Sequence, residues 1–138
     1  LIAADSNICR NYKLLTSIKG VGPITAIVML CSTLNFTKIT DHRKFACYCG
    51  LAPFEHSSGT SVRGGCHTSS MANRDIKVQL NRSALIAIRC DPQLKAYYER
   101  KVAEGKHKFS VLNAVRAKIA ARCFAVVRRG TPYVALQI

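Results

Sequence analysis

The chain of 138 residues is 49% hydrophobic, and its 21 lysines and arginines outnumber 7 acidic residues to give a formal net charge of +14. A chain of this length and apolar content can bury one core without disulfides or metals, while the excess of cations lies outside the range of an ordinary metabolic domain and points to nucleic acid. No apolar run approaches the roughly 20 residues of a spanning helix and no signal peptide opens the chain, so we expect no membrane partner.

The first residues predict that the chain is part of a longer protein, because it begins with Leu1 in the middle of a helical pattern. We expect residues 1–13 to be the tail of an upstream helix or a linker, and residues 14–138 to form one domain. Residues 74–138 carry 14 of the 21 basic side chains, so most of the positive field is expected in the C-terminal half.

Local signals in the first half predict two helices. Two glycines are followed by Pro23, which favours the first position of a helix running to about Leu30. After a polar connection, Asp41 is expected to cap a short helix that continues through Tyr48 and stops at Gly50.

Three longer helices are predicted in the second half. Apolar and basic residues alternate at helical spacing over residues 73–90, which indicates a helix with a basic outer face. Asp91 and Pro92 restart the chain as cap and first residue of a helix that stops at Gly105. The last helix is expected to run from a cap at Ser110 to Gly130.

The whole pattern predicts an all-α fold, a compact bundle of five or six helices containing a helix-hairpin-helix motif. Residues 51–70 are rich in glycine and hydroxyl side chains and poor in aliphatic ones, so we expect a long functional loop, with at most a small hairpin, at about 51–70.

The seven cysteines are an odd number, which is typical of reduced thiols in a cytoplasm rather than of a disulfide framework. Cys47, Cys49, Cys66 and His67 lack the usual spacings of a zinc site, and we predict no metal in this chain.

The turn before Pro23 is the strongest local motif and looks like the hairpin of a helix-hairpin-helix. Its glycines would let the backbone approach a phosphate, which the N–H groups at the start of the Pro23 helix would then face without regard to base sequence. The predicted contact residues are Lys19, Gly20, Val21, Gly22 and Thr25. The alternative is a glycine-rich turn between two packed helices, with Ile18, Val21 and Ile24 in the core.

A second motif is the pair Ser58-Gly59 in the glycine-flanked loop. Such a loop can present a hydroxyl to a substrate. On these residues alone, a solvated turn explains the dipeptide better. His56 lies nearby, but a neighbour two positions away in a loop seldom has the geometry of a general base.

Taken in order, these segments resemble the C-terminal domain of the DEDD insertion-sequence transposases, the group that includes the pilin-gene invertases. The resemblance covers about residues 14–134. It is carried by Gly20-Val21-Gly22-Pro23-Ile24-Thr25-Ala26, Asn35-Phe36, Phe45-Ala46, Gly50-Leu51-Ala52-Pro53, His56-Ser57-Ser58-Gly59, Asn73, Asp91-Pro92-Gln93-Leu94-Lys95-Ala96-Tyr97-Tyr98 and Arg129-Gly130-Thr131-Pro132-Tyr133.

The resemblance implies a transposase that attacks a DNA phosphodiester with the serine preceding a glycine, which here is Ser58, with Ser57 as the fallback. It also implies a structured guide RNA, a homodimer or higher oligomer, and a bacterial, cytoplasmic, nucleoid-associated setting. The family's four acids, which bind divalent metal such as magnesium, belong to a separate N-terminal domain. Glu55, Asp41 and Asp75 are therefore not assigned to that role, and this chain alone is expected to bind DNA without cutting it.

One stretch departs from the family pattern, because Cys66, Ser69, Ser70 and Ala72 stand where related sequences often place basic residues and a glycine. Arg63, Arg74 and Lys77 remain as candidates for phosphate contact, or else they form a solvated basic face. The alternative to a recombinase is a non-catalytic helix-hairpin-helix DNA-binding module, in which Ser58 is an ordinary turn residue. A domain that mainly builds an assembly is compatible with the recombinase.

Overall fold

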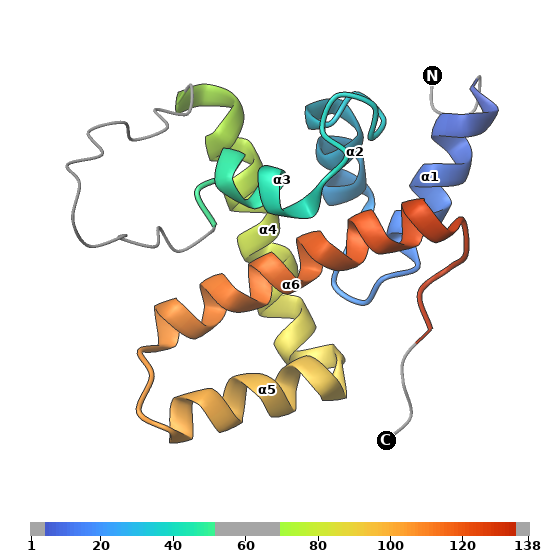
Figure 1. Ribbon diagram of the computed structural model, residues 1–138. Helices are drawn as coiled ribbons and strands as arrows, with labels where there is room; N and C mark the ends of the chain where they lie inside the picture. Colours follow the sequence, from blue (N-terminus) through green and yellow to red (C-terminus); the bar gives the residue numbers. More distant parts are fainter. Residues whose placement is uncertain (1–4, 52–69, 135–138) are drawn as a thin grey trace.

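The computed structural model describes residues 5–51 and 70–134, which form six helices and contain no strand (Figure 1). The predicted all-α class is therefore confirmed for these residues. Most of the predicted loop, residues 52–69, lies outside them. The helices are α1 (Ser6–Thr16), α2 (Pro23–Ser32), α3 (His42–Tyr48), α4 (Ser70–Cys90), α5 (Pro92–Ala103) and α6 (Lys108–Arg129).

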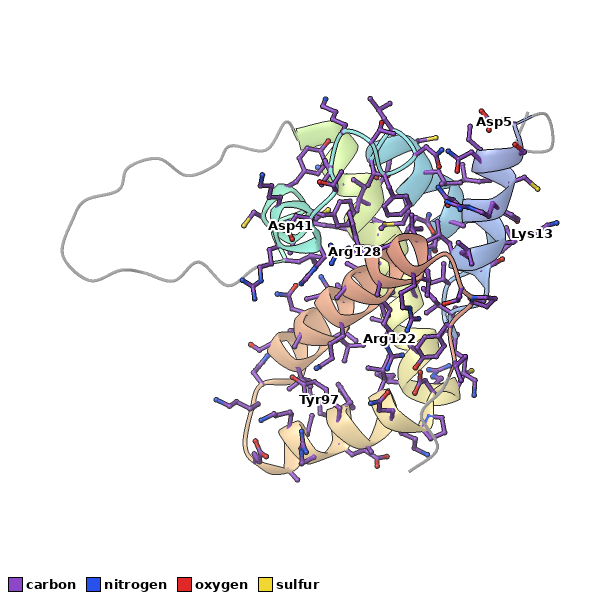
Figure 2. The ribbon with its side chains drawn as sticks, turned by 45° about the vertical axis from the view of Figure 1, so that its right-hand side comes forward. Asp5, Lys13, Asp41, Tyr97, Arg122 and Arg128 are labelled. Carbon is purple, nitrogen blue, oxygen red and sulfur yellow. The ribbon has the colours of Figure 1, made fainter. Side chains whose placement is uncertain are left out.

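The two longest helices, α4 and α6, cross and pack against each other at the centre. α4 also contacts α2 and α5, whereas α6 also contacts α1, α3 and α5. Figures 1 and 2 both show α3 and α5 on opposite sides of α6. The core of apolar side chains between them includes Leu15, Met29, Phe45, Leu80 and Ile119, each less than 2% exposed. Because both long helices are buried along one side, their outer sides are left for charged residues.

Two predicted helix starts are confirmed by their caps. The Asp41 carboxylate accepts the backbone N–H of Arg43 at 3.0 Å and starts α3. The Asp91 carboxylate accepts the N–H groups of Gln93 and Leu94 at 2.9 and 3.2 Å and starts α5. These bonds satisfy donors that have no partner inside the first turn of a helix.

Other boundaries differ from the predicted ones. α1 begins at Ser6, where the Asp5 carboxylate accepts two backbone N–H groups, and residues 1–4 lie outside the described residues. α4 begins at Ser70 instead of residue 73. The cap of α6 is His107, whose ring Nδ1 accepts the N–H of Phe109 at 3.3 Å, so Ser110 lies inside the helix. The backbone of His107 is extended, as is typical of a residue that caps a helix start, with ψ at 134°.

The connection after α2 contains three successive non-glycine residues in the left-handed region, Leu34, Asn35 and Phe36, with φ of 49°, 56° and 62°. This conformation is costly for L-residues. It is held in place because the Asn11 side chain donates to the Asn35 side chain at 2.7 Å, and because the Phe36 ring packs edge-on against Phe124 with centroids 4.9 Å apart.

Candidate nucleic-acid interface

The turn between α1 and α2 is shaped by contact with α4. Gly20 has φ of +96°, and a Cβ there would lie 2.7 Å from the backbone oxygen of Ser83 and 3.0 Å from the Cβ of Ala87. Both the left-handed conformation and the close approach of α4 therefore require glycine at this position. At Gly22, by contrast, an added Cβ would meet nothing within 4 Å.

The side chains of the predicted hairpin divide between the core and the surface. Val21 and Thr25 are each 5% exposed, and the Thr25 hydroxyl is hydrogen-bonded to that of Ser83 at 3.0 Å. Lys19 is exposed. Ile24 is 60% exposed, so the alternative that placed it in the core is wrong for that residue.

The start of α2 retains the features that the phosphate prediction needs. Gly22 caps the helix without a side-chain hydrogen bond, and Pro23 has no N–H. The next N–H groups, of Ile24 and Thr25, have no intrahelical partner. Lys19 is the exposed charged side chain of the predicted hairpin site, and phosphate contact at this turn stays a prediction.

The residues predicted around the nucleophile are only partly described. Ser57, Ser58 and Arg63 lie outside the described residues. Arg74 and Lys77 are exposed on α4. The Nζ atom of Lys77 lies 3.0 Å from where a Cβ on Gly50 would be, so α4 passes beside the end of α3, shortly before residue 52.

Two cations that the sequence analysis did not single out, Arg43 and Lys44, are exposed on α3. We define the α3–α4 surface as Arg43, Lys44, Arg74 and Lys77. No salt bridge joins any of these four to a carboxylate within residues 5–51 and 70–134. Exposed cations without acidic partners attract phosphate groups. The Leu51 carbonyl accepts the side-chain N–H of Asn113 on α6 at 2.9 Å. This hydrogen bond ties residue 51, next to this surface, to α6.

A second cationic region is a groove of about 1390 Å³ between α5 and α6, which we call the α5–α6 groove. This groove could not be predicted from the sequence, because its walls come from segments as far apart as residues 19 and 134. Its charged and aromatic lining residues are Lys19, Asp91, Tyr97, Arg100, Lys118, Arg122, Arg129 and Tyr133.

Among the described residues, Asp91 is the one carboxylate that lines the groove, and an arginine neutralises it. Asp91 Oδ2 accepts the Nη1 N–H of Arg122 at 2.7 Å, and Arg122 Nη2 donates to Gln93 at 2.8 Å. Burial alone would raise the pKa of Asp91, but the hydrogen bonds from Arg122 and from the N–H groups of Leu94 and Gln93 outweigh it and lower that pKa. Asp91 therefore stays ionised, and its negative charge is balanced by Arg122 and by the backbone N–H groups at the start of α5.

Buried thiols offer no nucleophile in the described part of the chain. Burial raises the pKa of Cys49 to about 12, although the charge of Lys77 opposes the shift, and burial likewise raises that of Cys123 to about 12. The thiolate is the reactive form of cysteine, so both residues are inert packing groups at neutral pH.

A divalent metal such as magnesium does not fit the acids of residues 5–51 and 70–134. No three potential metal ligands gather there. Asp5, Asp41 and Asp91 are occupied as helix caps, and Glu104 pairs with Lys101 at 3.1 Å. In the same residues, no helix has the length and apolar character needed to cross a membrane.

Comparison with known proteins places these features in a family. The model of the Transposase IS116/IS110/IS902 family matches residues 12–99. The chain is 39% identical over 120 residues to the insertion element IS110 uncharacterized 43.6 kDa protein of Streptomyces coelicolor, covering 86% of the chain and 29% of that protein. It is 25% identical over 134 residues to the pilin gene-inverting protein of Moraxella bovis, covering 96% and 42%. The chain thus spans less than half the length of these relatives.

Proposed function

This chain belongs to the IS116/IS110/IS902 family of transposases, and from that premise we propose that it is the DNA-engaging, nucleophile-bearing part of a bacterial transposase that cuts and rejoins DNA. In this role it would act during the movement of an insertion sequence. The names of its relatives, an insertion-element protein and a pilin gene-inverting protein, support a recombinase rather than another class of basic protein.

The observation that carries the proposal is the approach of α4 to the end of α3, the two helices that flank the segment 52–69 in the chain. Arg43 and Lys44 precede the segment 52–69 in the chain, and Arg74 and Lys77 follow it, all four exposed. The approach of Lys77 to Gly50 brings the two sides of that segment together. A phosphate backbone bound to these cations would lie where the chain enters and leaves the segment that contains Ser58.

The proposed step is attack by the Ser58 hydroxyl on a DNA phosphorus atom. A serine Oγ–P bond forms, the bond from phosphorus to one sugar oxygen breaks, the serine gives its proton to a base, and the departing sugar oxygen takes up a proton. In rejoining, a sugar hydroxyl attacks the same phosphorus and releases the serine. Serine needs activation for such a step, and Ser57 is the alternative nucleophile.

Further groups of the site come from elsewhere in the protein under this proposal. Magnesium would be held by acidic residues of another domain, since those described here are occupied or scattered. A guide RNA, a homodimer or higher oligomer, and a cytoplasmic, nucleoid-associated location are likewise proposed from the family resemblance. This chain by itself would hold DNA without cutting it.

The test uses the intact transposase with end-labelled substrate DNA, resolved on a denaturing gel. Wild-type protein should give a protein–DNA adduct that resists denaturation. Ser58→Ala should abolish the adduct and recombination while its equilibrium affinity for DNA is kept. Ser57→Ala should retain the adduct and recombination. Loss of the adduct in Ser57→Ala alone would move the nucleophile to that residue, and adducts in both variants would reject the serine mechanism.

A second candidate function is a non-catalytic helix-hairpin-helix module. The N–H groups at the start of α2 that have no intrahelical partner, together with exposed Lys19, favour it. In that case wild-type protein would form no adduct, and Ser58→Ala would bind DNA with the affinity of the wild type. The same gel therefore distinguishes the two functions.

A further inference from the structure

We propose that the α5–α6 groove binds an unpaired stretch of nucleic acid, with one base stacked on Tyr97 and the backbone held by the surrounding cations. Lys19, Arg100, Lys118 and Arg129 line this groove. All four are exposed, and none forms a salt bridge within the described residues. With Asp91 neutralised by Arg122, the groove presents a cationic surface to a ligand.

Aromatic rings lie among these cations. Lys118 Nζ is 4.5 Å from the centroid of the Tyr97 ring, and Arg100 Cζ is 5.7 Å from it. At the other end, Arg122 Cζ lies 4.8 Å from the centroid of the Tyr133 ring. Figure 2 shows Tyr97 directed from α5 toward α6. Both tyrosines are partly exposed, so a planar ligand that enters the groove can reach a ring.

The two tyrosines differ in how the cation over each ring is held. The backbone N–H of Tyr133 donates to the Ser17 hydroxyl at 2.9 Å, which ties the C-terminal segment to the end of α1, and Arg122 is fixed over its ring by two further hydrogen bonds. The cations over Tyr97 have no such second partner in the described residues, and lysine and arginine side chains are flexible. An incoming base can therefore displace Lys118 or Arg100 from the ring, and the displaced cation is then placed to meet the adjoining phosphate.

This combination suits unpaired nucleotides better than a double helix. In a duplex the faces of the bases are covered by their neighbours, so tyrosine rings inside a groove have nothing to stack on. Single-strand sites combine a positive groove that follows the backbone with aromatic rings that accept base faces. Such a strand could be a displaced DNA strand or an unpaired part of an RNA, and the two share the chemistry that the groove recognises.

The inference deepens the proposed function, since it rests on nucleic acid as the partner, but none of the four residues of the α3–α4 surface lines this groove. α5 and α3 lie on opposite sides of α6 (Figure 1). The binding test therefore uses the full chain with Ser58→Ala as the background, so that covalent chemistry does not enter. Failure of the adduct test rejects the nucleophile and leaves this result unaffected.

The first measurement is fluorescence anisotropy with unpaired oligo(dT), unpaired oligo(U) and a duplex of the same length. Tyr97→Leu keeps the apolar bulk but removes the ring, and it should weaken binding of an unpaired strand roughly tenfold while leaving duplex affinity unchanged. Tyr97→Phe keeps the ring and should bind like the parent. Tyr98→Leu, on the same helix but outside the groove, is the matched control. A preference for oligo(dT) or oligo(U) identifies the strand as DNA or RNA.

The second measurement needs no substitution in the groove. The chain is irradiated with an oligonucleotide that carries 5-iodouracil, and the cross-linked peptides are mapped by mass spectrometry. Cross-links on Tyr97 or Tyr133 are expected. The proposal is overturned by cross-links confined to other surfaces, by equal losses for duplex and unpaired strands in Tyr97→Leu, or by equal losses in Tyr98→Leu.

Discussion

The α3–α4 surface and the α5–α6 groove are both cationic, but their charges stand in different surroundings. On the α3–α4 surface, Arg43, Lys44, Arg74 and Lys77 project from helices into solvent, and none of them lies over an aromatic ring in the described residues. In the groove, Arg100 and Lys118 lie over the Tyr97 ring, and Arg122 lies over the Tyr133 ring. Positive charge alone predicts that a polyanion binds. The side chains next to the charge indicate whether a nucleic acid is recognised through its backbone only or also through its bases.

The regions also differ in how they are held. Asp41, the cap beside the α3–α4 surface, is half-buried and reaches one backbone N–H. Asp91, the cap in the groove, is buried and joins α5 to α6 through Arg122. The groove is therefore expected to depend on a single ion pair for its shape, and the α3–α4 surface on no pair of this kind.

The largest expected effect comes from breaking that pair. Arg122→Ala leaves the Asp91 carboxylate buried without its partner, which should lower the free energy of unfolding by about 3–5 kcal/mol in urea denaturation. The control Asp41→Ala removes a cap next to the other surface and should cost about 1 kcal/mol. Equal losses for the two variants would show that the groove is not held by this pair.

Lowering the pH should also show how much the Asp91–Arg122 ion pair contributes to stability. Because the pKa of Asp91 is lowered in the folded chain from its ordinary value of 3.8, this residue stabilises the fold above that pH, and the contribution is lost as the pH falls through the lowered pKa. Circular dichroism at decreasing pH should show that Asp91→Asn, already less stable at neutral pH, loses less further stability in acid than the wild type. An identical acid loss in both proteins would contradict the assignment.

An intermediate effect is expected at the α1–α2 turn, which brings Lys19 to the groove. Gly20→Ala places a Cβ against Ser83 and Ala87 and should destabilise the chain by about 1–3 kcal/mol in thermal and urea unfolding. Gly22→Ala, with open space around it, should cost less than about 1 kcal/mol. If Gly22→Ala proves as damaging as Gly20→Ala, contact with α4 is not what requires the first glycine.

The smallest effect on stability is expected on the α3–α4 surface, where a change should appear in binding. Replacing Arg74 and Lys77 by alanine should leave unfolding nearly unchanged but reduce the salt dependence of duplex binding, by about 0.9 in the log–log slope for each phosphate that the protein no longer neutralises. Binding of unpaired oligonucleotides should change less. Lys106→Ala, an exposed cation outside both regions, serves as the control, and an equal change in that variant would remove the distinction between the surfaces.

Much of the fold could be predicted because helix boundaries are encoded locally. Asp41, Asp91 and Gly130 act where short-range rules place them. His107 was missed because an imidazole is an unusual cap and Ser110 offered a more usual one. Ile24 was placed in the core by the alternative interpretation because its spacing matches buried neighbours, but the packing of α2 on α4 turns it outward.

The candidate site could be predicted only in part. Lys19, Arg74 and Lys77 are exposed cations in stretches that carry the motifs, so the sequence analysis named them. The groove escaped it because Lys19, Tyr97, Lys118 and Tyr133 meet only after α5 folds back along α6 and the C-terminal segment bonds to Ser17. No local rule relates residues this far apart in the chain.

The left-handed connection at Leu34–Phe36 has a consequence for engineering a protein of higher thermal stability. Leu34 is 59% exposed and sits at φ of 49°, so its side chain contributes little burial while its backbone is held in an unfavourable conformation. Glycine adopts the left-handed region without steric cost, so it would remove this strain at a position that belongs to neither cationic region. Leu34→Gly is therefore expected to unfold at a higher temperature without altering any residue proposed to touch nucleic acid.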